Sequence, residues 1–463
     1  MEAATLSCAP PSPAGPIEPE EADLLPRPPM VDLPRTAQVL RFNQRQIEFV
    51  FGARRRLGEV FRMRGIIPGG PVVTSHPDHV RSLFTAKPHL APSLTAESPL
   101  RPVLGPGSVL TANGDRHMRQ RKLLLPPFHG EAIERYVQMI TDVTERELGT
   151  WRLDEPMSLA PRMQAITLDV IMSGIFGIED RPAMGTAEWA LRAGTKHLLA
   201  MSTWPLAQVA ELLNLGRDEP VGLTKLGLEM IDRPTFAVIA ARRKVDDLGE
   251  RSDILSLLLR ARTEDGDALT DRELRDELLT LLLAGHETTA NQLAWTWERL
   301  VRNPEAHERL VETVRSGDSP DAEIEAVITE GMRSRPVIPA IGRRVAVPWR
   351  LGEYAVPAGT PVSMSILLVH HREDVYPDPF AFRPQRWHAR KPGTYEWIPF
   401  GGGTRRCLGA TLAMAEQRVV LREMARRLDL EAVDPEPEHA LHRNVTMIPA
   451  QGGRVVVTGR RAA

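Results

Sequence analysis

The sequence predicts a protein that is mainly α-helical and carries a small β region. Long stretches in the middle of the chain repeat apolar residues at the helical period. One of these stretches has both a defined start and a defined end, whereas patterns typical of strands are short and few. The chain has 463 residues, which is enough for a large buried core. It shows no internal repeat and no second linker, so residues 37–463 are expected to form one folding unit.

The first 36 residues are expected to form a poorly ordered, proline-rich tail. Their apolar residues follow neither a helical nor a strand period, and such a stretch buries too little surface to offset its ordering entropy. Helical periodicity starts near Ala37 and continues to Arg64, and a short strand is expected around Val72 to Ser75. The prolines of the tail are Pro10, Pro11, Pro13, Pro16, Pro19, Pro26, Pro28, Pro29 and Pro34.

The longest predicted helix follows Thr270. Thr270 and Glu273 have the spacing of a capping box, in which the two side chains satisfy free amides at a helix start. No strong helix breaker occurs until Pro304, so the helix spans roughly 45 Å at 1.5 Å per residue. Further helices are expected to open at Pro304 and at Pro320, the second ending before Pro336. Strands are expected at Arg343 to Val347, Glu353 to Val356, Pro361 to Met364 and Gly453 to Val457.

Composition and charge are those of a globular protein without a general affinity for nucleic acid. The formal net charge is -2, whereas nucleic-acid binding normally shows as a basic excess. The longest strongly apolar run, Leu278 to Gly285, is too short to cross a bilayer, so no transmembrane segment is expected. Residues 1–30 have neither the basic start nor the apolar run of a signal peptide. The two cysteines, Cys8 and Cys407, cannot form a disulfide framework, so we expect a reducing, cytoplasmic location.

The segment around Cys407 is the most informative part of the sequence. Gly401, Gly402 and Gly403 precede it and permit close backbone approaches that side chains would prevent. An apolar helix is expected from Ala410, so Cys407 lies just before a helix N-terminus, where backbone amides and the dipole favour a thiolate. A thiolate so placed is a good soft ligand for iron. The residues alone leave two other interpretations open, a phosphate-binding turn and a buried structural cysteine.

The same segment resembles the Phe-x-x-Gly-x-Arg-x-Cys-x-Gly signature of the cytochrome P450 family. The match runs through Phe400, Gly403, Arg405, Cys407 and Gly409. The resemblance implies the cytochrome P450 fold, haem b (iron protoporphyrin IX) as cofactor and Cys407 as the axial ligand of the iron. It also implies that the haem contacts Phe400, Gly401, Arg405 and Gly409.

A second segment resembles the Glu-x-x-Arg motif of this family. Glu330 and Arg333 lie on one helix face, although on spacing alone such pairs are common and usually solvated. The resemblance implies a buried structural network with a later arginine, here Arg386. The family more often has glutamate and phenylalanine where this chain has Gln385 and Trp387, and neither difference touches the two arginines.

A third segment lies midway along the longest predicted helix. Gly285 costs about 1 kcal/mol relative to alanine in a helix interior, and room for a flat ligand or dioxygen is one reason for its presence. Thr288 falls one turn after Ala284, so both can face one cavity, although incidental polar residues on a core helix are more common. The segment resembles the oxygen-activating motif of the family. That implies Glu287 and Thr288 as the catalytic acid–alcohol pair and Ala284 and Gly285 against the haem, with His286 an ordinary helix residue.

The remaining site residues concern the haem propionates. His117 and Arg121 share one face of a basic segment, which spacing alone would make a solvated helix face. The segment is similar to the family helix in which an aromatic residue or histidine and an arginine four residues later bind the propionates. Arg343, ten residues after Arg333, matches another propionate-binding arginine of the family. Planar guanidinium groups suit carboxylates for geometric reasons.

Together the resemblances imply a haem-thiolate monooxygenase that inserts one atom of O2 into an organic substrate. No flavin or dinucleotide motif stands out, so electrons are expected from a ferredoxin or flavodoxin with its reductase. The pocket wall is expected at Leu94 to Leu110, Thr195 to Leu213 and Val337 to Ile341, which are largely apolar and favour hydroxylation or epoxidation of a small lipophilic substrate. A haem-thiolate peroxygenase or isomerase is one alternative, against which the intact Glu287–Thr288 pair argues. A non-catalytic haem-binding sensor is the other.

Overall fold

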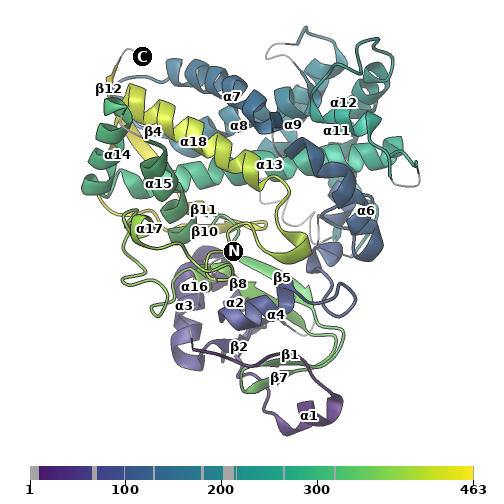
Figure 1. Ribbon diagram of the computed structural model, residues 1–463, viewed down its shortest axis with the longest axis vertical. Coiled ribbons are helices and arrows are strands. Elements are labelled where there is room, and N and C mark those ends of the chain that lie inside the picture. Colours follow the sequence, from purple (N-terminus) through teal and green to yellow (C-terminus); the bar gives the residue numbers. More distant parts are fainter. Residues whose placement is uncertain are drawn as a thin grey trace. The chain divides into compact units, whose positions relative to one another are not determined.

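A computed structural model of the chain describes residues 10–64, 70–98, 100–128, 131–178, 182–201, 213–214, 216–263, 266–317 and 320–461. The chain divides into two compact units, the first made of Met1–Pro92, Ile140–Ile166 and Thr288–Ala463 and the second of Ser93–Met139 and Thr167–Glu287. Helices predominate and the sheets are small (Figure 1), so the predicted fold class is confirmed. That residues 37–463 fold together as one unit stays a prediction.

A four-stranded sheet lies in the first unit, in the order β2-β3-β8-β5. These strands are Val60–Arg62, Val72–Thr74, Pro361–Ser365 and Ala340–Arg344 respectively. β3 pairs with β8 in parallel, while β2 and β5 pair antiparallel with their neighbours. Val72, Val362 and Met364 are fully buried in a core that also includes Leu83 and Phe84 of α4 (Pro77–Phe84). β5 and the end of α4 both lie against the glycines that precede Cys407: Ile341 of β5 is close to Gly401, and Phe84 of α4 is close to Gly402 and Gly403.

Residues 10–36 are ordered, in contrast to the expected tail. Strand β1 (Ala14–Pro16) pairs antiparallel with β6 (Trp349–Leu351), which in turn pairs with β7 (Tyr354–Val356), and a short helix α1 (Pro19–Leu24) follows β1. The expectation was wrong for this part because the partners of β1 lie more than 300 residues away, where no local periodicity can show them. Residues 1–9 of the predicted tail lie outside the described residues.

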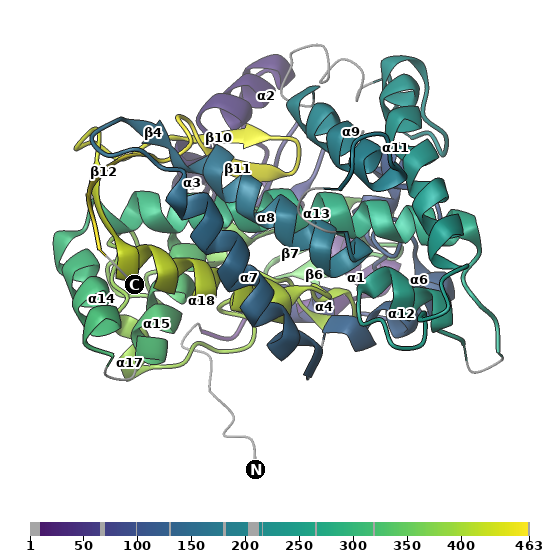
Figure 2. The same cartoon turned by 90° about the horizontal axis from the view of Figure 1, so that it is seen from above.

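The first unit also contains a hairpin, another sheet and further helices. A hairpin of β10 (Ala440–Arg443) and β11 (Thr446–Pro449) lies beside α2 (Arg35–Gln44) and α3 (Gln46–Leu57), as Figure 2 shows. A three-stranded sheet has the order β4-β12-β9, with bounds Met157–Ser158, Arg454–Arg460 and Leu428–Ala432. The other helices are α14 (Pro304–Ser316), α15 (Pro320–Ser334), α16 (Ile366–Val369), α17 (Arg386–Ala389), η3 (Gly403–Arg405) and α18 (Ala410–Arg427).

All regular elements of the second unit are helices, within the described residues. It contains η1 (Leu94–Glu97), α5 (Arg101–Leu104), α6 (Gly114–Leu124), η2 (Pro126–Phe128), α9 (Ala187–Met201), α11 (Gly222–Arg242) and α12 (Ile254–Arg260). Three helices have residues in both units: α7 (Glu131–Gly149), α8 (Leu159–Phe176) and α13 (Asp271–Leu300). None of the helices in the described residues is long and apolar enough to cross a membrane.

The helix starts predicted after Thr270 and at Pro304 and Pro320 agree with the structure. The helical pattern predicted from Ala37 to Arg64 is wrong at its end, because α3 ends at Leu57 and Val60–Arg62 pair with β3 as strand β2. The ends of the predicted strands also differ. Thr270 and Glu273 form the capping box, because Thr270 N donates to Glu273 Oε2 (2.9 Å) and Glu273 N donates to Thr270 Oγ1 (3.2 Å). Helices α14 and α15 begin at Pro304 and Pro320 as predicted. β5 begins three residues before the predicted Arg343, since its pairing with β8 extends the ladder to Ala340.

Candidate active site

Cys407 lies exposed at the end of a tight loop. Its backbone N donates a hydrogen bond to Phe400 O (2.9 Å), which closes the loop, and α18 begins three residues later at Ala410 with Gly409 as its N-cap. The thiol is therefore at the N-terminal end of an 18-residue helix. The positive end of the helix dipole favours the thiolate form of such a cysteine.

The three glycines before Cys407 make room for the end of α4. Gly401 and Gly403 have φ angles of +67° and +63°, a region that favours glycine. A Cβ on Gly403 would lie 2.1 Å from Phe84 O, and one on Gly402 would lie 2.3 Å from Phe84 Cδ2. A Cβ on Gly401 would lie 2.9 Å from Ile341 Cδ1 of β5. The glycine turn is thus set by close contact with Phe84 and β5.

Arg343 of β5 adds a buried positive charge to this part of the first unit. Its guanidinium lies over the Phe84 ring, 5.7 Å from the centroid, and the residue is only 5% exposed. Burial lowers the pKa of Arg343 to about 10. Within the described ranges no carboxylate pairs with this guanidinium; its Nη1 donates to Gly342 O. An exposed thiol at a helix start and a buried guanidinium without a counter-charge fit a cofactor that offers iron and carboxylates.

The structure brings Glu330, Arg333 and Arg386 together in the same unit. Glu330 and Arg333 are fully buried, with Arg333 Nε and Nη2 each donating to a Glu330 oxygen at 2.8 Å. Arg386 Nε donates to the same carboxylate at 3.2 Å. Trp387 Nε1 donates to Glu330 Oε2 at 3.1 Å. The tryptophan that differs from the common family pattern is thus part of the network, which sequence reasoning missed.

Two features that no motif indicated run from this network toward the cysteine loop. Arg333 Nη1 donates to His370 O (2.9 Å), and the His370 ring accepts a hydrogen bond from Ile398 N (2.8 Å). Burial lowers the pKa of His370 to about 3, so its ring is neutral and its Nε2 can act as the acceptor. In addition, aromatic rings lie in a row from Trp387 through Trp397 to Phe400, with centroids 6.5 and 6.2 Å apart.

One face of α13 is uncovered at its midpoint. Residues 274–280 and 289–300 are buried, whereas Ala284 is exposed and Leu281 and Thr288 are half-buried. Positions 281, 284 and 288 succeed each other at spacings of three and four, so they share one side of the helix. Glu287 is half-buried beside them. The predicted pair of Ala284 and Thr288 therefore faces the same uncovered side.

The neighbours Gly285 and His286 have packing roles in the second unit. A Cβ on Gly285 would lie 2.6 Å from Ile171 Cδ1, so the glycine allows α8 to pack closely against α13. The reason expected from the sequence was instead room for a ligand. His286 is 3% exposed, and its Nδ1 lies 2.9 Å from Thr167 Oγ1, which also donates to His286 O (3.0 Å). His286 therefore links α13 to α8 through hydrogen bonds. The sequence predicts an ordinary helix residue without such a role.

The predicted propionate residues of the second unit are on α6. His117 is buried and Arg121, one turn later, is half-buried. Helix α6 is bound to the start of α13 through the capping-box residue Glu273. Arg119 Nη1 and Gln120 Nε2 donate to Glu273 Oε1 at 2.9 and 3.1 Å. The second unit also contains Ala284, Gly285 and Glu287. The first unit contains Thr288, Arg343 and the cysteine loop from Phe400 to Gly409, which includes Gly401, Arg405 and Cys407. Positions 99 and 202–212 of the predicted pocket wall lie outside the described residues.

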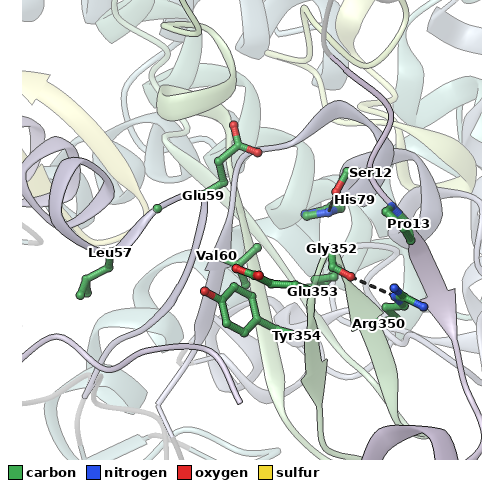
Figure 3. A pocket seen from close by; sticks show the side chains of 12 residues that line it. Ser12, Pro13, Leu57, Glu59, Val60, His79, Arg350, Gly352, Glu353 and Tyr354 are labelled. Carbon is green, nitrogen blue, oxygen red and sulfur yellow. Dashed lines mark hydrogen bonds between the residues drawn. The ribbon is translucent and has the colours of Figure 1, made fainter. Parts of the chain in front are cut away.

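A groove of about 410 Å³ lies elsewhere in the first unit (Figure 3), and none of its lining residues is a predicted site residue. His79 lies at its edge, where its Nε2 is 2.9 Å from Ser12 Oγ and its Nδ1 is 2.7 Å from Thr74 Oγ1. Burial, with smaller contributions from His76 and Arg372, lowers the pKa of His79 to about 3. Both ring nitrogens are hydrogen-bonded to hydroxyl groups, so His79 holds the segment before β1 in place. Neither nitrogen is available to act as a base or a ligand.

Comparisons of sequence find relatives over nearly the whole chain. Residues 26–456 match the family model described as Cytochrome P450. The curated protein Putative cytochrome P450 137 of Mycobacterium tuberculosis is 35% identical over 455 residues, covering 94% of this chain and 91% of the relative. Putative cytochrome P450 138 of Mycobacterium bovis is 37% identical over 447 residues, covering 94% and 98%.

Comparisons of structure find the same fold. One similar structure, described as retinoic acid bound cyanobacterial CYP120A1, has a TM-score of 0.79 at 23% identity and covers 94% of this chain and 100% of that chain. Another, described as the cytochrome P450DA heme domain, has a TM-score of 0.78 at 22% identity and covers 94% and 98%. At these identities the likeness concerns the fold alone.

Proposed function

Since the chain belongs to the cytochrome P450 family of haem-thiolate monooxygenases, we propose that Cys407 is the axial ligand of its haem iron. The observation that supports this most is the exposed thiol at the start of α18, in a loop closed by the bond to Phe400 O. When bound, haem supplies the redox chemistry that activates O2. Phe400, Gly401 and Gly409 would contact the haem from the same loop.

The propionates would be bound by Arg343, Arg405, His117 and Arg121. Arg343 is the best supported of these, since a buried guanidinium without a carboxylate partner in the described residues gains most from an incoming anion. The guanidinium fork matches a carboxylate in geometry as well as in charge. His117 and Arg121 are one turn apart on α6, a spacing that suits two groups acting on one ligand.

Thr288 and Glu287 would manage protons on the uncovered side of α13. The Thr288 hydroxyl can orient a water molecule, and the Glu287 carboxyl can relay protons to it. Ala284, one turn before Thr288, is exposed, and O2 would bind beside the hydroxyl on this side of the helix. The network of Glu330, Arg333 and Arg386 would brace the cysteine loop, through His370 and Ile398.

The reaction we propose is hydroxylation or epoxidation of a small lipophilic molecule in the cytoplasm. The largely apolar composition of the predicted pocket wall supports this substrate class, because apolar surface favours apolar ligands. Electrons would come from a ferredoxin or flavodoxin with its reductase, since no flavin or dinucleotide motif stands out in the sequence. With such a donor, NADPH oxidation should depend on O2 and on a bound substrate. Turnover with hydrogen peroxide alone, and none with the donor, would instead indicate a peroxygenase.

The absorption spectrum of the reduced protein with carbon monoxide tests the proposed ligand. We expect a strongly red-shifted Soret band, because a thiolate donates electron density to the iron. The variant Cys407→Ser should lose this band, and Cys8→Ser, which removes the other cysteine, should retain it. A Soret band typical of histidine-ligated haem, or an unchanged spectrum in Cys407→Ser, would refute the assignment.

A further inference from the structure

Two adjacent carboxylates of α13 bind the backbone of residues 103–112 within the second unit. Asp276 Oδ2 accepts a hydrogen bond from Gly107 N, and Glu277 Oε1 accepts one from Val109 N, each at 2.9 Å. Both carboxylate side chains are fully buried. A buried backbone amide left without an acceptor is costly, so each of these bonds stabilises the contact.

Two further side chains of the same helix contact this segment. Arg275 Nη1 donates to the carbonyl oxygens of Val103 and Leu104, both at 3.3 Å. Thr280 Oγ1 and Ser108 Oγ form a hydrogen bond of 2.6 Å. The first turns of α13 thus contact residues 103–109 along their length.

The segment is also shaped to lie close to the helix. A Cβ on Gly105 would be 2.2 Å from the carboxylate oxygens of Asp276, and one on Gly107 would be 2.7 Å from Oδ2. Gly105 has a φ angle of +88°, which favours glycine. Neither position has space for a side chain, so the two glycines and Asp276 form one closely fitted contact.

This contact lies next to predicted site residues in both chain segments. Residues 103–110 belong to the predicted pocket wall, and α6 with His117 begins shortly after them, at Gly114. On α13, Glu277 precedes the exposed Ala284 by seven residues, which is close to two full turns. The contact therefore lies on the helix face that leads to the uncovered stretch.

We propose that Asp276 and Glu277 are positioning residues that fasten residues 103–112 to α13 and thereby set one wall of the substrate pocket. The fastening itself is independent of the proposed function, whereas its effect on substrate binding rests on that function. Neither carboxyl touches the reacting atoms; they act through the backbone that they bind.

The fastening depends on the protonation of Glu277. Its Oε2 has no hydrogen-bond partner in the described residues, and burial, with Asp276 and Glu273 nearby, raises its pKa well above the usual value, against smaller opposing effects of Val109 N and Arg116. Burial likewise raises the pKa of Asp276, against the opposing effects of Gly107 N, Arg275 and Arg272. The Arg275 guanidinium forms ion pairs with both Asp276 and Asp232 of α11. Asp276 is paired with Arg275, whereas no cation of the described residues lies at bonding distance from Glu277.

The sign of the pH dependence results from the raised pKa. When residues 103–112 open and expose Glu277 to water, its pKa returns to the ordinary value of 4.5. Between that value and the raised one, the closed form needs a proton that the open form releases. Closing is therefore favoured less as pH rises through this interval. The variant Glu277→Gln, which retains an acceptor and needs no proton, removes the part of the dependence that Glu277 causes and leaves the part due to Asp276.

Amide hydrogen exchange of the haem-loaded protein, measured over peptides that cover residues 103–112, tests the fastening. After correction for intrinsic exchange, protection in the wild type should fall by up to about tenfold per pH unit above pH 4.5. In Glu277→Gln it should fall less steeply with pH, because only Asp276 still has a raised pKa. In Glu277→Ala, without the acceptor, it should be about tenfold lower than in Glu277→Gln. The control Glu308→Gln, an exposed glutamate of α14, should behave as the wild type. Equal protection in the wild type and Glu277→Gln at every pH would overturn the proposal.

The effect on the pocket is tested by binding of clotrimazole, a lipophilic azole, monitored through the Soret shift of the haem. Glu277→Ala should weaken the affinity by about tenfold if the fastened segment forms a wall of the pocket. The affinity of the wild type should fall with rising pH relative to that of Glu277→Gln. Wild-type affinity in a Glu277→Ala variant that has lost protection would overturn the role in the pocket. Failure of the proposed function would show separately, in the carbon monoxide spectrum.

Discussion

Glu330 illustrates how much one buried carboxylate organises at the scale of a residue. Its two oxygens accept hydrogen bonds from Arg333, Arg386 and Trp387 and from the backbone N of Arg383. Arg333 in turn donates to three carbonyl oxygens of residues 370–381. A fully buried charge is tolerated only when its oxygens are satisfied in this way, so each donor matters to stability.

The contribution of Trp387 can be measured with a matched control. Trp387→Phe should lower the free energy of unfolding by about 2 kcal/mol, because it removes a hydrogen bond to a charged acceptor. Trp397→Phe should cost about 1 kcal/mol or less for its hydrogen bond, since Trp397 Nε1 donates to the neutral Thr329 O at the longer distance of 3.3 Å. Denaturant unfolding monitored by circular dichroism compares the two. Equal losses would mean that the bond to Glu330 adds nothing beyond the ring.

At the scale of an element, α13 carries different tasks on different sides and along its length. Its first turns bind residues 103–112 and α6, and its midpoint is uncovered around Ala284. Next to that stretch, Gly285 and His286 pack against α8. Because successive residues of a helix point in different directions, adjacent positions can serve a ligand and the packing at once.

Adjacent threonines separate these tasks experimentally. Thr288 is half-buried on the uncovered side, whereas Thr289 is only 5% exposed. Thr288→Ala should reduce productive turnover on the order of a hundredfold and divert reducing equivalents to hydrogen peroxide, because a proton donor to oxygen is lost. Thr289→Ala should leave the ratio of peroxide to NADPH consumed unchanged. If both variants have the wild-type ratio, Thr288 has no part in proton delivery.

At the scale of the whole molecule, buried histidines should make stability sensitive to acid. Burial lowers the pKa of both His79 and His370 to about 3, from the ordinary value of 6.5. Below pH 6.5 the unfolded chain binds protons that the folded one excludes, so their contribution is complete above 6.5 and is lost as pH falls toward 3. Each histidine should lower the free energy of unfolding by about 1.4 kcal/mol for each pH unit of acidification in that interval.

The thermal unfolding midpoint measured across this pH range checks the expectation. His79→Gln should make the decline shallower, because one of the excluded protons no longer contributes. The same change at His89, which is exposed, should leave the slope as it is in the wild type. An identical slope in all three proteins would mean that His79 does not contribute to acid sensitivity.

The sequence by itself determined the features that depend on near neighbours. The capping box of Thr270 and Glu273, the helix starts at Pro304 and Pro320 and the mainly α fold class all result from local rules, and the structure confirms them. The family signature around Cys407 is likewise contained in ten consecutive residues. Such features are readable because the interactions that create them lie within a few residues along the chain.

The tertiary structure alone decided which distant groups meet. Ser12 and His79 are 67 positions apart, Glu277 and Val109 are 168 apart, and β1 pairs with a strand more than 300 residues away. Gly285 accommodates Ile171, and Trp387 joins the Glu330 network, for reasons that exist only once the chain is folded. A buried polar group must find its partner wherever the fold places one, and no local pattern records that distance.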